Sequence, residues 1–398
     1  MLNIENTKLN NREINDKKII LQSYPQEIWL SVTNKCNLSC THCKLGTPER
    51  ENMRRSKRID ISDKVFEKIK NQVFPYINKI VFGGNELSEQ LFCKNWDYIF
   101  EETAKFPMEI HIVSNGTLLT EERMRKFIER EVTLSISMES CNRELYEAVR
   151  GKNNYDKVFN LIKYGCELKK KLNKDKAVIK FGITLFRDNI YELPEIIEFA
   201  SKIGVSEINA GHLCPHFEYQ RDQVLVYHKD TYNQVYDIAM EKAQKLGVIL
   251  TMFPKFYIPK INEKNIEKPQ ICGEKNKDCY LPWNVTSISQ EGKVTPCSRV
   301  TSIMGDLNKE DFFDIWNNKR YQSLRKSVNN GNPADYCKYC SVRGDGKVPD
   351  SSILATIGMG AGISTKRMLL LNIKEKMLSN KITKPAYYLL EKVYRRIY

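Results

Sequence analysis

Three cysteines at CxxxCxxC spacing place the strongest constraint on what this chain can fold into. Cys36, Cys40 and Cys43 follow directly on an alternating, strand-like segment, Ile28–Val32. Three thiolates can ligate three irons of a [4Fe–4S] cube and leave the fourth iron open to a substrate or cofactor. One alternative is a structural zinc knot, in which His42 would have to supply the fourth ligand that zinc normally takes. The other alternative is three unrelated thiols.

The rest of the composition favours a cytoplasmic metalloprotein. The chain contains no run of 18 or more apolar residues, and residues 1–18 have no apolar core of a secretory signal. We therefore expect a cytoplasmic protein, in a compartment that keeps thiols reduced. Twelve cysteines in such a protein are more typical of metal or redox ligands than of disulfides. The 398 residues are enough for two or three domains.

Residues 25–254 alternate strand and helix patterns. The predicted strands are Glu27–Val32, Lys79–Phe82, Met108–Val113, Val132–Ser137, Ala177–Leu185 and Val205–Asn209. The predicted helices are Asp60–Val73, with Ser62 as its N-cap, Ser88–Lys105, Thr120–Arg130, Tyr155–Leu172, Tyr191–Ile203 and Thr231–Leu246. Six such units predict an α/β fold, a (βα)6 partial TIM barrel with parallel strands and right-handed crossovers. Chemistry is then expected at the C-terminal ends of the strands.

The segments outside the barrel have different compositions. Residues 1–24 form an N-terminal extension, and residues 255–350 are rich in Cys, Gly, Pro and Asn, which predicts a small domain held by metal. A Gly-rich linker, 351–365, leads to a helical tail, 366–398, with nine Lys or Arg and two Glu. The basic tail and the net charge of +14 could allow the protein to bind weakly to an anionic membrane surface, a partner or nucleic acid. A Lys-rich background that only maintains solubility is the simpler interpretation.

The cysteine loop after a first strand resembles that of the radical S-adenosylmethionine (SAM) superfamily, and further motifs follow in that family's order. Gly83-Gly84-Asn85-Glu86 ends the second strand and resembles the Gly-Gly-Glu-Pro motif that receives the methionine amino group of SAM. Glycines at this point let a ligand approach the backbone closely. Asn85 stands where Glu is usual and Glu86 where Pro is usual, which leaves the side-chain role open. The resemblance includes His42, inside the cysteine loop, among the candidate cofactor contacts.

The remaining candidate SAM contacts lie at or after the ends of the third and fourth predicted strands. Ser114 and Asn115 begin a stretch similar to the family's Thr-Asn-Gly-Thr-Leu-Leu, and an Asn-Gly turn is the alternative for Asn115. Ser137 resembles the serine that hydrogen-bonds the ribose or carboxylate of SAM. Arg150, before Gly151, resembles the arginine that binds the SAM carboxylate, a task that suits its planar pair of donors. No catalytic acid or base can be named from the sequence.

A second cysteine pattern lies in the C-terminal part. It resembles the first part of the SPASM domain, or its truncated "twitch" relative, in the pattern C-x12-G-x4-C…CxxC formed by Cys279, Gly292, Cys297, Cys337 and Cys340. The resemblance implies that these four thiolates hold a fully ligated auxiliary [4Fe–4S] cluster, with a zinc site as the alternative. No cysteine follows Cys340, so a second auxiliary cluster is not expected. Cys272 is a spare candidate ligand, and ordinary buried thiols are expected at Cys93, Cys141, Cys166 and Cys214.

The resemblance as a whole implies an oxidoreductase. Its cofactors would be SAM and two [4Fe–4S] clusters, with a flavodoxin- or ferredoxin-type reductant as partner. Reductive cleavage of SAM would give a 5′-deoxyadenosyl radical that abstracts hydrogen from a substrate C–H, and the auxiliary cluster would accept the electron left on the product. Members of the family that modify peptides often carry an N-terminal peptide-recognition domain, and the segment before the first strand is short here. The expected substrate is therefore a sugar- or polyol-like small molecule. The alternatives are a ribosomally made peptide, or a non-catalytic iron–sulfur or zinc protein that binds nucleic acid.

Overall fold

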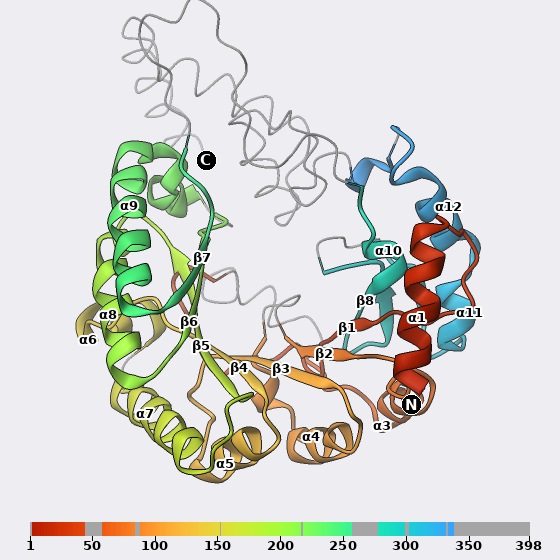
Figure 1. Cartoon of the computed structure of the whole chain (residues 1–398), viewed down its shortest axis with the longest axis horizontal. Helices are drawn as coiled ribbons and strands as arrows, with labels where there is room; N and C mark the ends of the chain where they lie inside the picture. Colours follow the sequence, from red (N-terminus) through yellow and green to blue (C-terminus); the bar gives the residue numbers. More distant parts are fainter. Residues whose placement is uncertain are drawn as a thin grey trace, which may run out of the picture.

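One continuous sheet organises the molecule. The computed structural model describes residues 2–43, 58–83, 88–151, 153–215, 218–256, 278–298, 302–331 and 333–337. Their strands form a ten-stranded sheet in the order β10-β9-β8-β1-β2-β3-β4-β5-β6-β7. The sheet curves, and helices α4, α5, α7, α8 and α9 cover its outer side (Figure 1).

The elements have the following bounds. The strands are β1 (Glu27–Leu30), β2 (Lys79–Phe82), β3 (Glu109–Ser114), β4 (Thr133–Ser137), β5 (Val178–Leu185), β6 (Glu207–His212), β7 (Ile249–Met252), β8 (Val285–Ile288), β9 (Lys293–Thr295) and β10 (Gly305–Asp306). The α-helices are α1 (Leu2–Asn15), α3 (Asp63–Gln72), α4 (Trp96–Ala104), α5 (Glu121–Glu129), α6 (Arg143–Arg150), α7 (Tyr155–Lys171), α8 (Leu193–Ile203), α9 (Lys229–Leu246), α10 (Leu281–Asn284), α11 (Phe312–Trp316) and α12 (Lys319–Ser327). Short 3-10 helices are η2 (Gln90–Phe92), η3 (Ile190–Glu192), η4 (Glu218–Gln223), η5 (Leu225–Tyr227) and η6 (Asp335–Cys337).

The parallel part of the sheet confirms the predicted partial barrel. Strands β1 to β7 pair in parallel with their sequence neighbours, from Glu27↔Lys79 at one end to Glu207↔Ile249 at the other. Side chains alternate between the two faces of a strand. On β1, Ile28 and Leu30 on one face are fully buried, whereas Trp29 on the other face is only partly buried. Strand β7 is an addition to the six predicted strands.

The sheet continues from the barrel into the C-terminal part. Strand β8 pairs in parallel with β1, from Glu27↔Val285 to Leu30↔Ile288, and β9 and β10 add antiparallel strands beyond it. The turn between β8 and β9 requires Gly292, whose φ is +78° and whose added Cβ would lie 3.0 Å from Asn308. The low periodicity of this region had not predicted these strands.

The N-terminal helix α1 packs through a polar face. Its buried side chains are Asn6, Asn10 and Glu13, spaced by one or two helical turns. Asn10 Nδ2 donates to Ser23 Oγ at 2.9 Å and to the carbonyl of Trp283 at 2.8 Å. The Glu13 carboxylate accepts bonds from the backbone N–H of Gln22 and Ser23. Helix α1 therefore bonds the start of the barrel to the segment that leads into β8.

The barrel helices follow the predicted pattern with two differences, whereas α10, α11 and α12 lie in a region for which no helix was predicted. Ser62 caps α3 by accepting from Val65 N at 3.3 Å, as predicted, and Thr120 caps α5 in the same way. The predicted helix Ser88–Lys105 is in fact η2 and α4, separated near Cys93 and Asn95. Helix α6 was not predicted.

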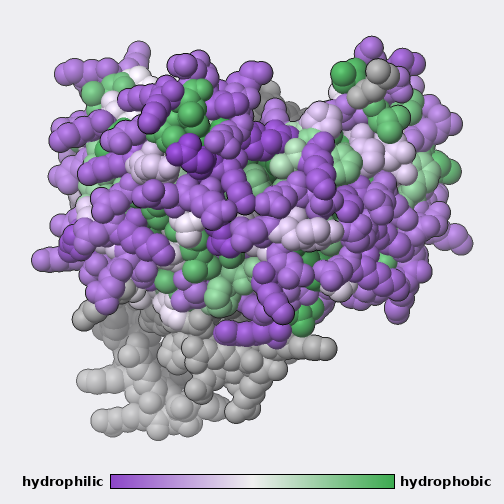
Figure 2. All heavy atoms as spheres, turned by 90° about the horizontal axis from the view of Figure 1, so that it is seen from below, coloured by the Kyte–Doolittle hydropathy of each residue, from purple (hydrophilic) through white to green (hydrophobic). Residues whose placement is uncertain are grey.

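The outer surface is polar. The face seen from below in Figure 2 is mostly hydrophilic, with hydrophobic side chains in small separate groups. Many of the basic side chains on the outer helices are paired with acids, as in Lys126–Glu101 at 2.8 Å and Arg123–Asp97 at 2.8 Å. In the part of the chain that the structure describes, no helix has both the length and the apolar character needed to cross a membrane.

Candidate functional site

The three-cysteine loop lies at the C-terminal end of β1, where the barrel fold places chemistry. Its entrance is held by Lys35, whose ammonium lies 2.7 Å from Asp60 Oδ2 and whose carbonyl accepts from Glu89 N at 2.8 Å. Its far end is held by Thr41, which donates from its backbone N–H to the carbonyl of Val149 at 3.0 Å. Segments that follow β1, β2 and β4 along the chain thus fix the loop from several sides.

Hydrogen-bond donors point at two of the three sulfurs. Cys36 Sγ has the N–H of Leu38 at 3.4 Å and Nδ2 of Asn115 at 3.9 Å. Cys40 Sγ has Nη1 of Arg150 at 3.9 Å. Burial raises the pKa of the Cys40 thiol to about 11. A thiol in such a place becomes a thiolate at neutral pH only beside a positive partner such as a metal. The donor set fits an iron–sulfur cluster, since N–H groups commonly surround cluster sulfurs.

The zinc alternative for this loop needs His42 to join the cysteines as a fourth ligand. Within the described ranges, no three His, Cys, Asp or Glu side chains converge closely enough to hold a single metal ion. A four-iron cube does not require that convergence, because each thiolate binds a different iron. His42, the fourth zinc ligand of that alternative, instead has Nε2 3.6 Å from Glu139 Oε1. Its buried Nδ1 has no protein partner among the described residues, so a bound cofactor could supply one.

A buried carboxylate, Glu89, supports the Cys36 side of the loop. It is 1% exposed and accepts from Ser114 Oγ at 2.9 Å and from Asn115 N at 2.6 Å. Asn115 Nδ2 also bonds Asn37 Oδ1 at 3.0 Å, inside the cysteine loop. Burial raises the pKa of Glu89. The motif Ser114-Asn115 is therefore directed at the cysteine loop. No pattern along the chain marks Glu89, which resembles any surface glutamate in its sequence context.

A second buried carboxylate, Glu139, supports the Cys40 side. It is 1% exposed and receives Nε of Arg150, which is itself 5% exposed. Burial opposes ionisation of Glu139, but Arg150 and His42 leave its pKa lowered. Burial likewise lowers the pKa of His42, whose ring lies 6.4 Å from that of Phe186. Arg150, Glu139 and His42 thus form one buried group beside Cys40.

The other candidate SAM contacts lie at neighbouring strand ends. Gly83 follows β2 with φ +88°, and an added Cβ would crowd Gln90 and the carbonyl of Val113 at 3.2–3.3 Å. Gly84, Asn85 and Glu86 lie outside the described residues. Ser137 ends β4 and is partly buried. Contacts of all these residues with SAM stay predictions.

The described C-terminal cysteines are Cys279, which precedes α10, Cys297, which follows β9, and Cys337, which ends η6. Cys279, Cys297 and Cys337 are each 9% exposed, while Cys340 and Cys272 lie outside the described residues. Asn329 exchanges two bonds with the backbone of Cys279, at 2.8 and 3.1 Å. Tyr336 lies within electrostatic reach of both Cys297 and Cys337, which raise its pKa in addition to the effect of burial. The described cysteines are therefore buried, as cluster ligands would be.

The prediction for the four other cysteines was partly wrong. Cys93 and Cys166 are buried as expected, at 4% and 3% exposure. Cys141 is only partly buried and Cys214 is exposed. Cys214 follows β6 at the rim of the barrel, where loops replace regular packing.

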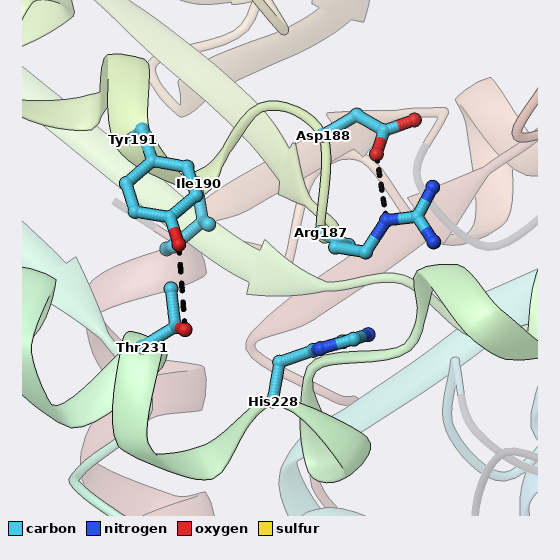
Figure 3. A pocket seen from close by; sticks show the side chains of 6 residues that line it. All are labelled: Arg187, Asp188, Ile190, Tyr191, His228 and Thr231. Carbon is cyan, nitrogen blue, oxygen red and sulfur yellow. Dashed lines mark hydrogen bonds and ion pairs between the residues drawn. The ribbon is translucent and has the colours of Figure 1, made fainter.

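A cavity of about 440 Å³ opens at the barrel rim near this site (Figure 3). It lies between the loop after β5 and the start of α9 and is lined by Arg187, Asp188, Ile190, Tyr191, His228 and Thr231. Tyr191 Oη lies 3.4 Å from Thr231 Oγ1, and Arg187 pairs with Asp188 at 2.8 Å. None of the predicted site residues lines it. The cavity is connected to the predicted site through Phe186, which precedes the lining residue Arg187 and whose ring faces that of His42.

Comparison with family models gives two matches. Residues 30–200 match the radical SAM superfamily, and residues 279–341 match SPASM, an iron–sulfur cluster-binding domain. The first match covers the cysteine loop and the strand-end motifs. The second covers Cys279, Cys297, Cys337 and Cys340.

Individual relatives are distant but span most of the chain. A tungsten-containing aldehyde ferredoxin oxidoreductase cofactor-modifying protein of Pyrococcus furiosus is 23% identical over 79% of this chain and 87% of its own length. The radical SAM cyclopropyl synthase TigE of Paramaledivibacter caminithermalis is 27% identical over 80% of this chain and 66% of its own. Among solved structures, Streptococcus suis SuiB bound to its precursor peptide SuiA is similar with a TM-score of 0.57 at 14% identity, over 80% of this chain and 70% of that chain. SuiB has also been solved with SAM bound.

Proposed function

Because the chain is a radical SAM protein with a C-terminal SPASM-type iron–sulfur domain, and SAM and [4Fe–4S] clusters are therefore its cofactors, we propose that it is an oxidoreductase acting on a substrate C–H bond. When bound, SAM and the cluster of Cys36, Cys40 and Cys43 supply reductive cleavage to a 5′-deoxyadenosyl radical. The observation that carries this proposal is the cysteine loop at the end of β1, with Cys40 buried, Cys36 and Cys43 partly buried, and N–H donors directed at Cys36 and Cys40.

The chain's own residues would bind and orient the cofactor. Gly83 leaves room for a ligand beside the backbone at the end of β2, and Ser137 lies two strands away on the same edge of the sheet. His42 Nδ1 is a buried group that a cofactor atom could reach. Burial of the site, in turn, keeps water from a reactive intermediate. For Arg150, a bond to the SAM carboxylate would have to be made alongside its ion pair with Glu139.

The C-terminal cysteines would hold the auxiliary cluster, and the partner would be a flavodoxin- or ferredoxin-type reductant. Cys279, Cys297, Cys337 and Cys340 provide four thiolates, so that cluster would have no iron open to substrate. We therefore assign it the role of accepting the electron that remains on the product, which makes the net reaction an oxidation. A cytoplasmic location, expected from the sequence, is part of the same proposal.

Two substrate classes deserve separate tests. The sequence prediction is a sugar- or polyol-like small molecule. A ribosomally made peptide is favoured by the similarity to SuiB, which was solved with its precursor peptide SuiA bound and is similar over 80% of this chain. Within the described residues, the end strands β7 and β10 of the sheet are not paired with each other, an arrangement compatible with either class. The relative from P. furiosus is named as a modifier of an enzyme cofactor, which is a different kind of substrate from either class.

The first experiment measures SAM cleavage. The anaerobically reconstituted protein, reduced with dithionite, should form 5′-deoxyadenosine from SAM, quantified by liquid chromatography. Replacing Cys36, Cys40 or Cys43 with Ala should abolish the product. Cys214→Ala is the matched control, because this exposed cysteine lies outside both ligand sets. Undiminished cleavage in any one of the three loop variants would overturn the proposal.

The second experiment separates the two substrate classes. The enzyme is incubated with polyols and with short peptides encoded beside its gene, and each mixture is analysed by mass spectrometry. Oxidation removes two hydrogen atoms from the true substrate. Transfer of deuterium from a labelled substrate into 5′-deoxyadenosine would show that the same molecule donates the abstracted hydrogen. A redox-neutral product would contradict the role assigned to the auxiliary cluster.

A further inference from the structure

Two buried carboxylates flank the cysteine loop in matching arrangements. Glu89 holds the backbone of Asn115, whose side chain reaches Cys36 Sγ. Glu139 holds the guanidinium of Arg150, which reaches Cys40 Sγ. On each side the order is carboxylate, N–H donor, sulfur. The N···S distance is 3.9 Å on both sides.

The donors have little freedom to point elsewhere. Asn115 is 7% exposed, and its Oδ1 accepts from Thr117 N at 2.8 Å and from Thr117 Oγ1 at 2.7 Å. With its oxygen occupied in this way, the amide must present Nδ2 to Asn37 and Cys36. Arg150 is 5% exposed, and its Nε is bound by Glu139, which turns Nη1 toward Cys40.

The burial of Glu89 and Glu139 costs free energy, which their bonding partners beside the loop must offset. Burying an ionised carboxylate is unfavourable unless charges or hydrogen bonds compensate it. The backbone carbonyl of Glu139 also accepts a hydrogen bond from Asn189 Nδ2 at 3.0 Å, which fixes the backbone from which the Glu139 side chain extends. The structure thus fixes one charged donor and one neutral donor beside two neighbouring ligands of the same loop.

We infer that Asn115 and Arg150, positioned by Glu89 and Glu139, are the hydrogen-bond donors that set the reduction potential of the cluster held by Cys36, Cys40 and Cys43. N–H donors to cluster sulfurs stabilise the more negative, reduced state and so raise the potential. Arg150 adds a positive charge to the same effect. Neither role is that of a SAM contact, and each is open to measurement without SAM.

The test is an EPR-monitored redox titration of the full chain without SAM or substrate. The signal of the first cluster is the one that the Cys36/Cys40/Cys43 triple Ala variant lacks. Asn115→Leu and Arg150→Met should each keep the iron content and lower the midpoint potential of that signal. Arg150→Lys, which keeps the charge but lacks the planar donor pair, should fall between Arg150→Met and the unmodified protein.

Glu139→Gln and Lys180→Met are the matched comparisons. Glu139→Gln removes the negative charge and leaves Arg150 uncompensated, so the midpoint potential should rise. Lys180→Met removes another partly buried cation, which is paired with Glu207 at 3.7 Å, and should produce a smaller change in the midpoint potential. If Arg150→Met fails to assemble the cluster, Arg150→Lys is judged by the same criterion.

An unchanged midpoint potential and EPR spectrum in Asn115→Leu and in the Arg150 variants would overturn the inference. Because no SAM is used, that result would leave the proposed SAM cleavage untouched.

Discussion

At the scale of single residues, Arg150 shows how surroundings decide a role. Its position before Gly151 predicted a contact with the SAM carboxylate. In the folded chain the guanidinium already has a carboxylate partner, Glu139, and lies 3.9 Å from Cys40 Sγ. Planar donors suit both tasks, so the residue type alone cannot choose between them. The burial of Glu139 at 1% exposure makes the ion pair a fixed part of the site.

Histidine burial gives a pH prediction at the same scale. Burial lowers the pKa of His212 to about 4, and its Nε2 has no partner in the described part of the chain. The unfolded histidine takes up a proton near its ordinary pKa, about 6.5, whereas the folded one does not, so the contribution of His212 to stability is constant above that pH and falls below it. Between pH 7.5 and 5.5 this one group should reduce the free energy of unfolding by about 1.4 kcal/mol.

His212→Phe should remove that part of the pH dependence. The ring already packs against Tyr232 and Phe253, with centroids 4.7 and 5.0 Å away, so Phe fits the surroundings. Urea unfolding of both proteins at pH 7.5 and 5.5 measures the difference. His111, whose pKa burial lowers to about 3, should keep the variant partly acid-sensitive. Equal pH dependence in the two proteins would show that His212 is not neutral through burial.

At the scale of elements, α1 is the clearest departure from sequence periodicity. Amphipathic helices are recognised by an apolar stripe, but the buried face of α1 is made of Asn6, Asn10 and Glu13. Leu2 and Ile4 of the same helix are more than half exposed. A polar stripe becomes a packing face only when distant segments supply partners, here Ser23 and Trp283 among others.

Asn10→Ala should therefore destabilise the protein, although the position is polar. The substitution removes the donor to Ser23 Oγ and to the Trp283 carbonyl and leaves these buried groups without their partner. The expected loss is about 2 kcal/mol in the free energy of unfolding by urea. Asn11→Ala is the matched control on the exposed neighbour, where the change should stay within about 0.5 kcal/mol. Similar values for the two variants would mean that α1 is not a structural clamp.

At the scale of the whole molecule, the barrel and the C-terminal region share one sheet. The register Glu27↔Val285 joins the first barrel strand to β8, and Arg325 joins them again by donating to the carbonyls of Pro282 and Ile19 at 2.9 and 3.1 Å. Its guanidinium lies 4.5 Å from the centre of the Trp316 ring. Within the described residues, the two cysteine sets are therefore carried on one continuous framework.

Iron content tests the two cysteine sets together. Anaerobic reconstitution should give about eight irons per chain, as two [4Fe–4S] clusters. The Cys36/Cys40/Cys43 triple Ala variant should retain about four. Chemical iron analysis with Mössbauer spectroscopy distinguishes these values from a zinc site. About twelve irons would reveal a third cluster, and zinc bound by Cys279, Cys297 and Cys337 would remove the electron-accepting role.

The basic tail is tested on the full chain against a chain truncated after Ser364. Residues 366–398 carry nine basic and two acidic side chains, and each cation near anionic lipid is worth about 1 kcal/mol. The full chain should sediment with anionic liposomes at low salt, less so at high salt, and the truncated chain should not sediment. Neutral liposomes are the control. Equal sedimentation of both chains would refute membrane binding by the tail, and a lower thermal stability of the truncated chain would assign the tail to the folded core.

The sequence by itself determined the features that depend on neighbours along the chain. The spacing of Cys36, Cys40 and Cys43, the alternation of strand and helix patterns, and the cap at Ser62 are local properties, and the predicted barrel follows from them. Covalent spacing fixes which thiolates can share one cluster, and side-chain period fixes which face of an element is apolar. The position of β7 and the division of Ser88–Lys105 into η2 and α4 depended on packing, and were missed.

Only the tertiary structure decided which polar groups are buried. Glu89 and Glu139 are charged residues that would ordinarily lie in water, and each is buried because a distant segment provides its partner. The pairing of β1 with β8 likewise joins residues far apart in the chain. Burial and long-range pairing require several segments to come together, so a local sequence pattern cannot predict them. The chemistry of the cysteine loop could therefore be predicted from its residues, whereas the groups that surround it could not.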